Sequence, residues 1–427
     1  MKVASPKISS IVSTCPACGL LCDDIQLENK SSKIKVLTKG CNKAVRFFEQ
    51  PLENVTPQIN GKPATLQQAI SHVAELLKAS QQPLLAGLGT DVAGFRSLYH
   101  LSQKINGILQ HMNAQSTARN MKVLQSTGWQ TTTLTELKNR ADVIVCFGDV
   151  AAHNPRFFER FIDVDGMFID ANQRQLIFVG ENCARNIHSK AEISPKGTPA
   201  SLLACRAVDL PEITIALRAL VVGKALKVTE IAGVKISDLQ TVANKLKAAK
   251  YAVLAWVAKD LDYPHSELTI QNITETVAIL NQTTRAAGLP LGGSDGDTSA
   301  NNANTWLSGL ALNDEIVEHD LMIWVNSFGV DKLPPKTDKP LIVFGNTNLV
   351  GAAIRREASL GDAEKLSRRV AAPTNTPDVF IPIATPGLDC SGMLFRVDSA
   401  VILPLKKIRD NNLPTLSEVV REIEALL

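Results

Sequence analysis

The stretch DVIVCFGDV, residues 142–150, decides the fold class of this 427-residue chain. An unbroken apolar run follows Asp142 and ends at Gly148. A strand of a parallel sheet has this pattern, because helices cover the sheet on both faces and both sets of side chains are buried. The stretch therefore predicts a buried parallel strand.

The same pattern recurs further along the chain. Four more apolar runs are LIFVG (176–180), YAVLAWVA (251–258), LMIWVNS (321–327) and LIVFGN (341–346). Helical segments such as 213–223 and 236–249 lie between some of these runs. Alternation of strands and helices predicts an α/β protein with doubly wound parallel sheets. The last two runs are close together in the sequence, and we expect them to rejoin the first sheet.

Turn and capping signals support this organisation. PLLAGLGTDVAGF (83–95) predicts a strand, a glycine turn and the start of a helix. Val92 stands where G-x-G-x-x-G needs its third glycine, so the turn is Rossmann-like without being a dinucleotide fingerprint. Capping boxes are predicted at Thr65 and at Thr415. The polar stretch GGSDGDTSANNAN (292–304) predicts a long loop, either on the surface or lining a cleft.

Composition narrows the function classes. With 45% hydrophobic residues the chain can form two or three domains. A formal net charge of +3 gives no indication of a nucleic-acid or membrane-surface partner. The N-terminus lacks a signal-peptide pattern, and no apolar run is long enough for a membrane span. Four cysteines are scattered singly, as in a reducing cytoplasm, where we expect the protein to act: Cys146, Cys183, Cys205 and Cys390.

The other four cysteines form a motif near the N-terminus. TCPACGLLCDDI (14–25) and KGCNKAVRFFE (39–49) give the spacing C-x2-C-x3-C-x18-C. Four thiolates at such spacing favour an iron–sulfur cluster of the 4Fe–4S type, which needs four ligands. Zinc more often uses two C-x2-C pairs, and a vestigial, empty site is the third alternative. The predicted ligands are Cys15, Cys18, Cys22 and Cys41.

These motifs resemble a known family. CPACGLLCDDI with KGCNKA resembles the iron–sulfur module of molybdopterin oxidoreductases, most closely the B subunit of formylmethanofuran dehydrogenase. DVIVCFGDVAAHNPRFFERF (142–161) is similar to the strand, glycine turn and "HPR" segment of that family. The region 372–404 is similar to its C-terminal signature, whose last positions here are Gly387, Asp389, Gly392, Arg396 and Asp398.

The resemblance implies a molybdopterin-oxidoreductase-like α/β fold that lacks the C-terminal β-barrel domain. It implies a small cysteine module over 1–58 and a first Rossmann-like domain formed by 59–112 and 317–390. A second Rossmann-like domain would cover 113–316, and a C-terminal segment with a helix 391–427.

Two functions fit the resemblance. One is the B subunit of a bacterial formyltransferase/hydrolase complex, which converts a formyl group to formate in tetrahydromethanopterin- and methanofuran-linked one-carbon metabolism of methylotrophs. The alternative is the molybdenum- or tungsten-pterin catalytic subunit of a formylmethanofuran dehydrogenase. The family's metal-ligating cysteine is expected near 110–130, but this chain has no cysteine between Cys41 and Cys146. We therefore expect a structural, redox-inactive subunit without molybdopterin, whose own catalytic activity is doubtful.

Site residues follow from the same resemblance. His153, Arg156 and Lys43 are predicted to contact a cofactor, and no catalytic residue is predicted. The alternative for the segment of His153 and Arg156 is an exposed helix start, with Pro155 in its first turn. Lys43 is equally open to interpretation as a solvated side chain.

The resemblance also implies partners. They are the other subunits of a heteromeric complex and a polyglutamylated, methanofuran-type carrier. A free-standing iron–sulfur electron carrier is a weaker alternative, because such a carrier needs little more than the cysteine module.

Overall fold

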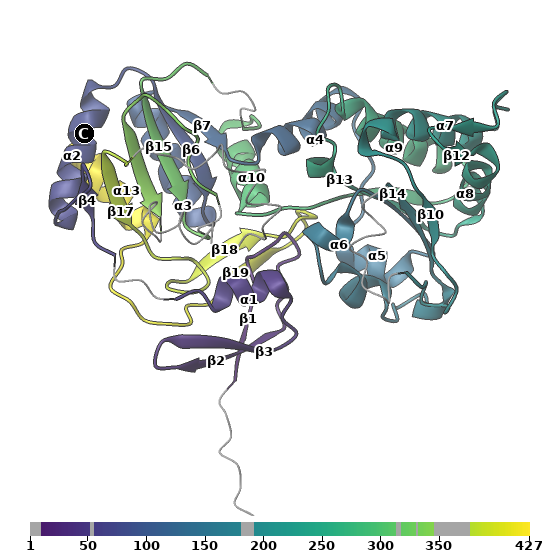
Figure 1. Cartoon of the computed structure of the whole chain (residues 1–427), viewed down its shortest axis with the longest axis horizontal. Helices are drawn as coiled ribbons and strands as arrows, with labels where there is room; N and C mark the ends of the chain where they lie inside the picture. The colour runs from purple at the N-terminus through teal and green to yellow at the C-terminus, as the bar shows by residue number, and fades with distance from the viewer. Residues whose placement is uncertain (1–9, 52–54, 181–191, 313–316, 330–331, 346–375) are drawn as a thin grey trace, which may run out of the picture. The chain divides into compact units, whose positions relative to one another are not determined.

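The computed structural model describes residues 10–51, 55–180, 192–312, 317–329, 332–345 and 376–427 (Figure 1). Cys183 and the start of the C-terminal signature, 372–375, lie outside them. The chain forms two compact units. The first comprises 1–114, 294–395 and 402–427, and the second comprises 115–293 and 396–401.

The cysteine module opens the first unit. Its strands are β1 (Ile11–Ser13), β2 (Ile25–Lys30) and β3 (Lys33–Thr38), which form an antiparallel sheet. Helix α1 (Asn42–Phe48) follows and buries Ala44, Phe47 and Phe48. The described part of this module thus contains three short strands, the cysteine loop and one helix.

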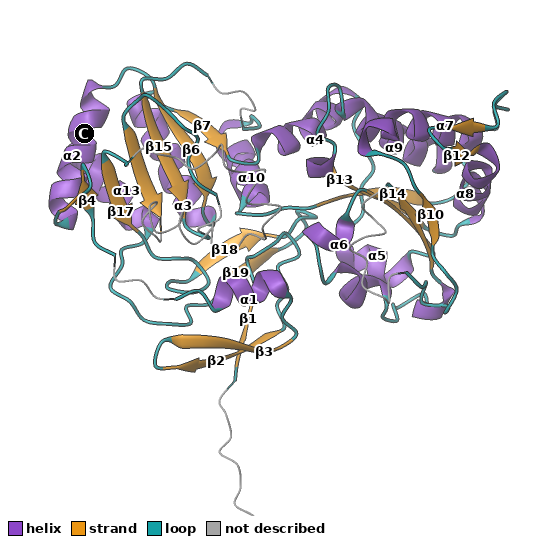
Figure 2. Ribbon diagram, in the orientation of Figure 1, coloured by secondary structure: helices purple, strands orange, loops and turns teal. Residues whose placement is uncertain are grey.

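The first unit is built on a seven-stranded sheet in the order β5-β4-β17-β16-β15-β6-β7 (Figure 2). Five strands are parallel, and β4 and β5 add an antiparallel edge. The strands are β4 (Gln58–Ile59), β5 (Lys62–Pro63), β6 (Pro83–Gly89), β7 (Ile108–His111), β15 (Leu321–Asn326), β16 (Leu341–Gly345) and β17 (Val379–Pro382). The expectation that the two late strands rejoin the first sheet is confirmed, because β15 pairs with both β6 and β16.

Helices cover this sheet through a shared apolar core. Leu98 of α3, Ile70 of α2 and Val420 of α13 are fully buried with Ile323 of β15 and Phe344 of β16. Both predicted capping boxes, at the starts of α2 and α13, are present. The helices are α2 (Leu66–Ala79), α3 (Val92–Ile105), α10 (Asp297–Ser308) and α13 (Leu416–Leu426), and β18 (Gly392–Phe395) pairs with β19 (Ile402–Leu405).

The second unit contains a fully parallel five-stranded sheet in the order β10-β9-β8-β13-β14. Its strands are β8 (Val143–Phe147), β9 (Gln175–Val179), β10 (Ser201–Leu203), β13 (Ala252–Val257) and β14 (Ala286–Leu291). Every residue of β8 and β13 is buried, as the apolar runs predicted. The unit also contains α4 (Ala114–Ser126), α5 (Leu134–Arg140), α6 (Val150–His153), a π-helix (Phe158–Ile162), α7 (Leu210–Val222), the hairpin β11 (Glu230–Ile231) and β12 (Val234–Lys235), α8 (Ile236–Ala248) and α9 (Glu267–Leu280).

The predicted loop at 292–304 is wrong for most of its length, because Asp297–Ser308 is helix α10. Its glycines stay outside the helix, and Gly296 adopts a φ of +74° just before it starts. Ala300 and Ala303 are buried against the first-unit core. The side-chain amide of Asn304 donates to Leu310 O at 2.9 Å. Tertiary burial of one face thus overrides the weak helix propensity of the Asn and Ser residues.

Each parallel sheet reverses its strand order once. In the second unit the chain runs outward from β8 in one direction and from β13 in the other. In the first unit the same reversal separates β6 from β15. Ligands of open α/β sheets bind outside the carboxyl ends of the strands at such a switch point, which directs attention to the residues after β8, β13, β6 and β15.

Candidate functional sites

The cysteine loop is closed by its own backbone. Cys15, Cys18 and Cys22 lie on the loop between β1 and β2, and Cys41 immediately precedes α1. The Cys15 N–H donates to Cys22 O at 2.9 Å, and the Leu21 N–H donates to Cys18 O at 3.2 Å. Leu21 adopts a φ of +45°, so the turn needs a left-handed residue where the sequence provides no glycine.

Burial dominates the chemistry of these thiols. Cys15, Cys18 and Cys22 are buried, whereas Cys41 is half-buried. Burial and the neighbouring Cys18 raise the pKa of Cys15 well above its ordinary value. Burial and Cys22 raise the pKa of Cys18 to about 11, against the opposing effects of the Leu20 N–H and of Lys43. The Cys15 and Cys18 thiols therefore stay protonated near pH 7 unless a cation takes the place of their protons.

The donor set suits an iron–sulfur cluster. Backbone N–H groups of Ala17 and Leu20 hydrogen-bond to the Cys15 and Cys18 sulfurs, as second-layer donors do around such clusters. Among the described residues, no group of three or more His, Cys, Asp or Glu side chains is drawn together tightly enough to hold a metal ion. The fit therefore rests on four thiols, their burial and these N–H groups.

The lysines that flank Cys41 differ in their surroundings. Lys43 is half-buried on α1 and acts electrostatically on Cys18. Lys39 adopts a φ of +59° and its Nζ lies 3.7 Å from a carboxylate oxygen of Asp24. Lys43 thus acts on a cysteine, whereas Lys39 pairs with a carboxylate of the same loop. The contact of Lys43 with a cofactor remains a prediction.

At the switch point of the second unit, His153 meets Asp260. His153 ends α6 after β8, and Asp260 follows β13. The Nε2 of His153 lies 2.7 Å from Oδ1 of Asp260, while Oδ2 accepts the Asp149 N–H at 2.7 Å. Burial acts to raise the pKa of Asp260, but these hydrogen bonds and the charge of His153 outweigh it, so the pKa lies below its ordinary range.

Arg156 does not join this pair. Its side chain is 5% exposed and its guanidinium donates to the Glu159 carboxylate at 2.7 Å and 3.2 Å. A helical segment does begin shortly after Pro155, the π-helix Phe158–Ile162, but Arg156 at its start is buried and not exposed. Asn154 is fully buried and bonds both the N–H and the C=O of Gly292 at 2.9 Å, which anchors the segment.

Asp260 was not predicted from the sequence, although its position after an apolar run could have indicated it. It follows the apolar run 251–258, and residues after such runs meet at one edge of a parallel sheet. Only the strand order, which no sequence pattern specifies, shows that β8 and β13 are neighbours.

A second polar network lies near the carboxyl ends of β6 and β7 in the first unit. His111 is buried; its Nδ1 accepts the Asn113 N–H at 2.9 Å and its Nε2 donates to Asp295 O at 3.1 Å. Lys332 Nζ contacts Asp295 Oδ2 at 2.5 Å and Asn113 Oδ1 at 2.7 Å. Burial acts to raise the pKa of Asp295, but Lys332 outweighs it and lowers that pKa, whereas burial lowers the pKa of His111. This network was not predicted from the sequence, because its residues come from three distant segments.

Known proteins resemble the chain over most of its length, although no family model matches it. It is 23% identical over 93% of its length to the B subunit of tungsten-containing formylmethanofuran dehydrogenase 2 of Methanocaldococcus jannaschii, and covers 93% of that protein. The same protein of Methanococcus maripaludis is 23% identical over 92% of each chain. The B subunit of the formyltransferase/hydrolase complex Fhc of Methylorubrum extorquens is 26% identical over 59% of this chain and 64% of its own length.

The resemblance to the B subunit of formylmethanofuran dehydrogenase is confirmed.

Solved structures share the fold. A chain of the formyltransferase/hydrolase complex FhcABCD of Methylorubrum extorquens, solved with methylofuran, aligns with a TM-score of 0.67 and 21% identity. That alignment covers 87% of this chain and 98% of the other. Acetylene hydratase from Pelobacter acetylenicus aligns with a TM-score of 0.62 and 9% identity, over 97% of this chain and 68% of the enzyme. In the described part of the chain, no helix is both long and apolar enough to cross a membrane.

Proposed function

We propose that this chain is the B subunit of a formyltransferase/hydrolase-type complex in methanofuran-linked one-carbon metabolism, and that it is structural and redox-inactive. Its relatedness to B subunits along nearly the whole chain supports the place in such a complex. The absence of any cysteine between Cys41 and Cys146 supports the lack of redox activity, because a thiolate is the protein ligand expected on a molybdenum or tungsten centre.

Cys15, Cys18, Cys22 and Cys41 would hold a 4Fe–4S cluster. When bound, such a cluster supplies one-electron transfer chemistry. In a redox-inactive subunit its contribution is structural, because coordination joins the β1–β2 loop to the start of α1 and adds binding free energy to folding. Cys41 is half-buried and would be the most exposed of the four ligands. We propose that molybdopterin is absent.

The finer fold proposal is a molybdopterin-oxidoreductase-like body without the terminal barrel. Its division follows the boundaries predicted from the sequence, except that the second domain ends at Gly293 and not at residue 316, because α10 packs in the first-unit core. His153 and Arg156 are proposed to contact a cofactor or what remains of its site. His153 sits at a switch point beside a carboxylate, whereas Arg156 would first have to exchange Glu159 for a ligand.

Partner subunits and a methanofuran-type carrier complete the proposal. The FhcABCD structure, one chain of which resembles this protein, is of a complex that contains methylofuran. By analogy, we propose that the present chain works in a heteromeric assembly in the cytoplasm and that a polyglutamylated carrier binds to this assembly.

The alternative is a metal–pterin catalytic subunit of a formylmethanofuran dehydrogenase. One observation favours it: the two dehydrogenase subunits match 93% and 92% of this chain, whereas the Fhc subunit matches 59%. The retained cysteines also suit a subunit that conducts electrons.

Metal and pterin analysis of the complex, purified without oxygen, separates the two functions. We expect about four irons per chain with neither molybdenum, tungsten nor pterin. Stoichiometric molybdenum or tungsten with pterin, together with dye-linked oxidation of formylmethanofuran, would overturn the proposal in favour of the dehydrogenase.

A further inference from the structure

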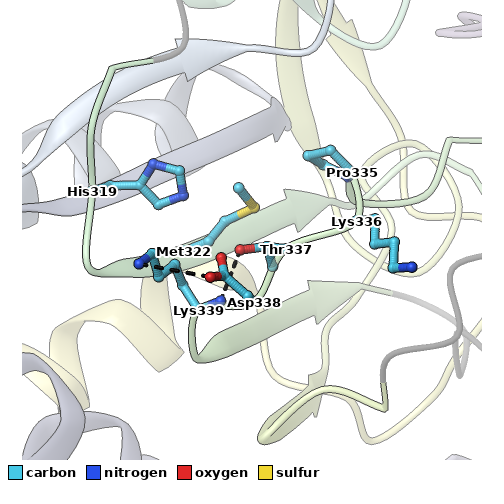
Figure 3. A pocket seen from close by; sticks show the side chains of 7 residues that line it. All are labelled: His319, Met322, Pro335, Lys336, Thr337, Asp338 and Lys339. Atoms are coloured by element: carbon cyan, nitrogen blue, oxygen red, sulfur yellow. Dashed lines mark hydrogen bonds and ion pairs between the residues drawn. The ribbon is translucent and has the colours of Figure 1, made fainter.

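Two surface features lie apart from the sites described above. One is a pocket of about 510 Å³ near the start of β15, lined mostly by exposed residues of the loop 335–339 (Figure 3). The Nε2 atom of His319 and the side chain of Met322 are buried, and Lys339 lies 3.9 Å from Asp338. This pocket is therefore loop surface, and we assign it no ligand. The other feature is the outer face of helix α7 in the second unit.

Helix α7 is apolar on almost every side. Its sequence, LPEITIALRALVV, contains only two charged residues, Glu212 and Arg218. Its inner face packs with α8 and α9 and buries Ile213, Leu217 and Leu220 in the core of the second unit (Figure 1). A helix that is apolar all round is normally buried all round. An exposed outer face on such a helix therefore indicates a surface that another protein covers.

Three aliphatic side chains form a row along this outer face. Val208, in the short 3₁₀ turn that leads into α7, is 54% exposed. Ile215 is 49% exposed, and Val222, the last residue of the helix, is 50% exposed. Successive members are seven residues apart in the sequence, which is about two helical turns, so they lie on one side of the helix.

The row and its charges are symmetric about Ile215. Val208 and Val222 lie seven residues before and after it. Glu212 and Arg218 lie three residues before and after it, a spacing that keeps them on the same face. Two such helices can pair antiparallel about a two-fold axis through Ile215. Each Val208 then meets Val222 of the partner subunit, and each Glu212 meets Arg218 of the partner subunit.

Both charged side chains can take part in such a contact. Glu212 is exposed and makes no ion pair with a residue that the structure describes. Arg218 contacts Glu275 of α9, and 33% of each of these two side chains is exposed. A guanidinium carries five N–H donors, so Arg218 can bind a second carboxylate beside Glu275. A parallel pair would instead bring like charges together, which is unfavourable.

We propose that α7 joins two copies of this chain into a dimer, as an antiparallel helix pair about a two-fold axis through Ile215. The occupant is a second copy, because the apolar and charged positions of the face match those of the same face turned round. A contact of this kind uses the same patch on both copies and closes after two. The proposal concerns the chain itself and does not rest on its proposed role in formyl transfer, so either can fail without the other.

Sedimentation velocity of the full-length chain tests the dimer. One helix per copy makes a small interface, so we expect monomer at about 1 µM and dimer at about 100 µM. Ile215→Glu places two carboxylates face to face on the axis and should weaken the dimer at least about tenfold. The matched control Met167→Glu changes another exposed apolar side chain of the second unit and should dimerise as the wild type does.

Charge reversal tests the pairing of Glu212 with Arg218 of the partner subunit. Glu212→Arg and Arg218→Glu should each weaken self-association, because like charges then meet across the axis. An equimolar mixture of the two variants should dimerise again, because each contact in the mixed pair joins opposite charges.

Oxidative crosslinking, with the wild type as the reference for the native cysteines, tests the geometry. Ile215→Cys should give a disulfide-linked dimer, because residue 215 faces its own equivalent. Val222→Cys should not, because the two copies of residue 222 then lie at opposite ends of the pair, about 21 Å apart along the axis. Ile215→Cys keeps a small apolar side chain at a half-exposed position, so it tests the contact even where a charged variant misfolds.

Several results would overturn the proposal. They are a wild type that stays monomeric at about 100 µM, an Ile215→Glu variant that dimerises as well as Met167→Glu, and a mixture of the charge-reversed variants that stays monomeric. Crosslinking of Val222→Cys as efficient as that of Ile215→Cys would equally contradict it. So would an Ile215→Glu substitution that releases a different subunit from the purified complex, because that face would then belong to another protein.

Discussion

The guanidinium of Arg409 pairs with the carboxylate of Asp389 at 2.7 Å, and both side chains are almost fully buried. Arg409 also donates to Gln50 O at 2.9 Å, and Asp389 accepts the Thr385 N–H at 3.1 Å. The pair thereby joins the C-terminal signature to the end of the cysteine module. Asp389 was recognised from the sequence as a signature residue, and its role here is to fix these two segments together.

Arg409→Met should therefore destabilise the first unit. It leaves the Asp389 carboxylate buried without its cation, which typically costs about 3–5 kcal/mol. Urea unfolding followed by circular dichroism measures the loss. The control Arg206→Met removes an ion pair whose arginine is 70% exposed, and it should leave the midpoint unchanged. Equal midpoints for the two variants would contradict the structural role.

Arg174→Lys should destabilise the second unit. Arg174 is fully buried and its guanidinium donates to the carbonyls of Ala141, Lys138, Ile162 and Val164. A lysine ammonium cannot reproduce this planar fork, so backbone acceptors lose their partners at about 1–3 kcal/mol each. Thermal unfolding of the variant measures the effect, and a melting temperature equal to that of the wild type would refute it.

Stability should fall as the pH drops below neutral, in part through His111. Burial lowers the pKa of His111 in the folded chain. In the unfolded chain the histidine has an ordinary pKa of about 6.5, so it binds a proton more readily than in the folded chain. The stability linked to neutral His111 is therefore complete above about pH 6.5 and is lost as the pH falls below that value. Replacing His111 by Gln should flatten the dependence of the unfolding free energy on pH between about pH 7.5 and 5.5. A His111→Gln slope equal to that of the wild type would rule the explanation out.

Cys18→Ser should abolish the cluster. Cys18 is the central ligand of the loop, and a serine hydroxyl is a poor substitute for a thiolate on iron. Iron content should drop from about four per chain to near zero, with loss of the visible absorbance. Cys390→Ser alters a half-buried cysteine outside the motif and should retain the iron. Equal iron in the two variants would argue against the four-cysteine site.

Much of the fold was predictable because it depends on local pattern. Val143–Phe147 and Ala252–Val257 are buried on both faces, and the apolar runs indicated their positions. The capping boxes at Thr65 and Thr415 depend on three-residue spacings that the sequence contains. Helix α10 was missed because Ala300 and Ala303 gain their helical state from burial in the core, which composition does not reveal.

The sites were predictable only in part. The cysteine spacing is local and could be read directly, whereas the His153–Asp260 pair joins residues 107 positions apart in the sequence. The Lys332–Asp295 pair depends in the same way on how distant segments pack together. Long-range pairs of this kind cannot be inferred from one sequence, because periodicity specifies which residues are buried and not which ones meet.

The alternation of the two units along the chain has a consequence for synthesis. The second unit takes nearly all its residues from the continuous stretch 115–293, whereas the first unit needs strands from before it and a helix, α13, that ends at Leu426. Domains fold as they leave the ribosome at about 5–20 residues per second. The second unit can therefore fold before the rest of the first unit has been synthesised. Strand β6 remains without its neighbour β15 during that time. We expect chaperone dependence to concentrate in that interval.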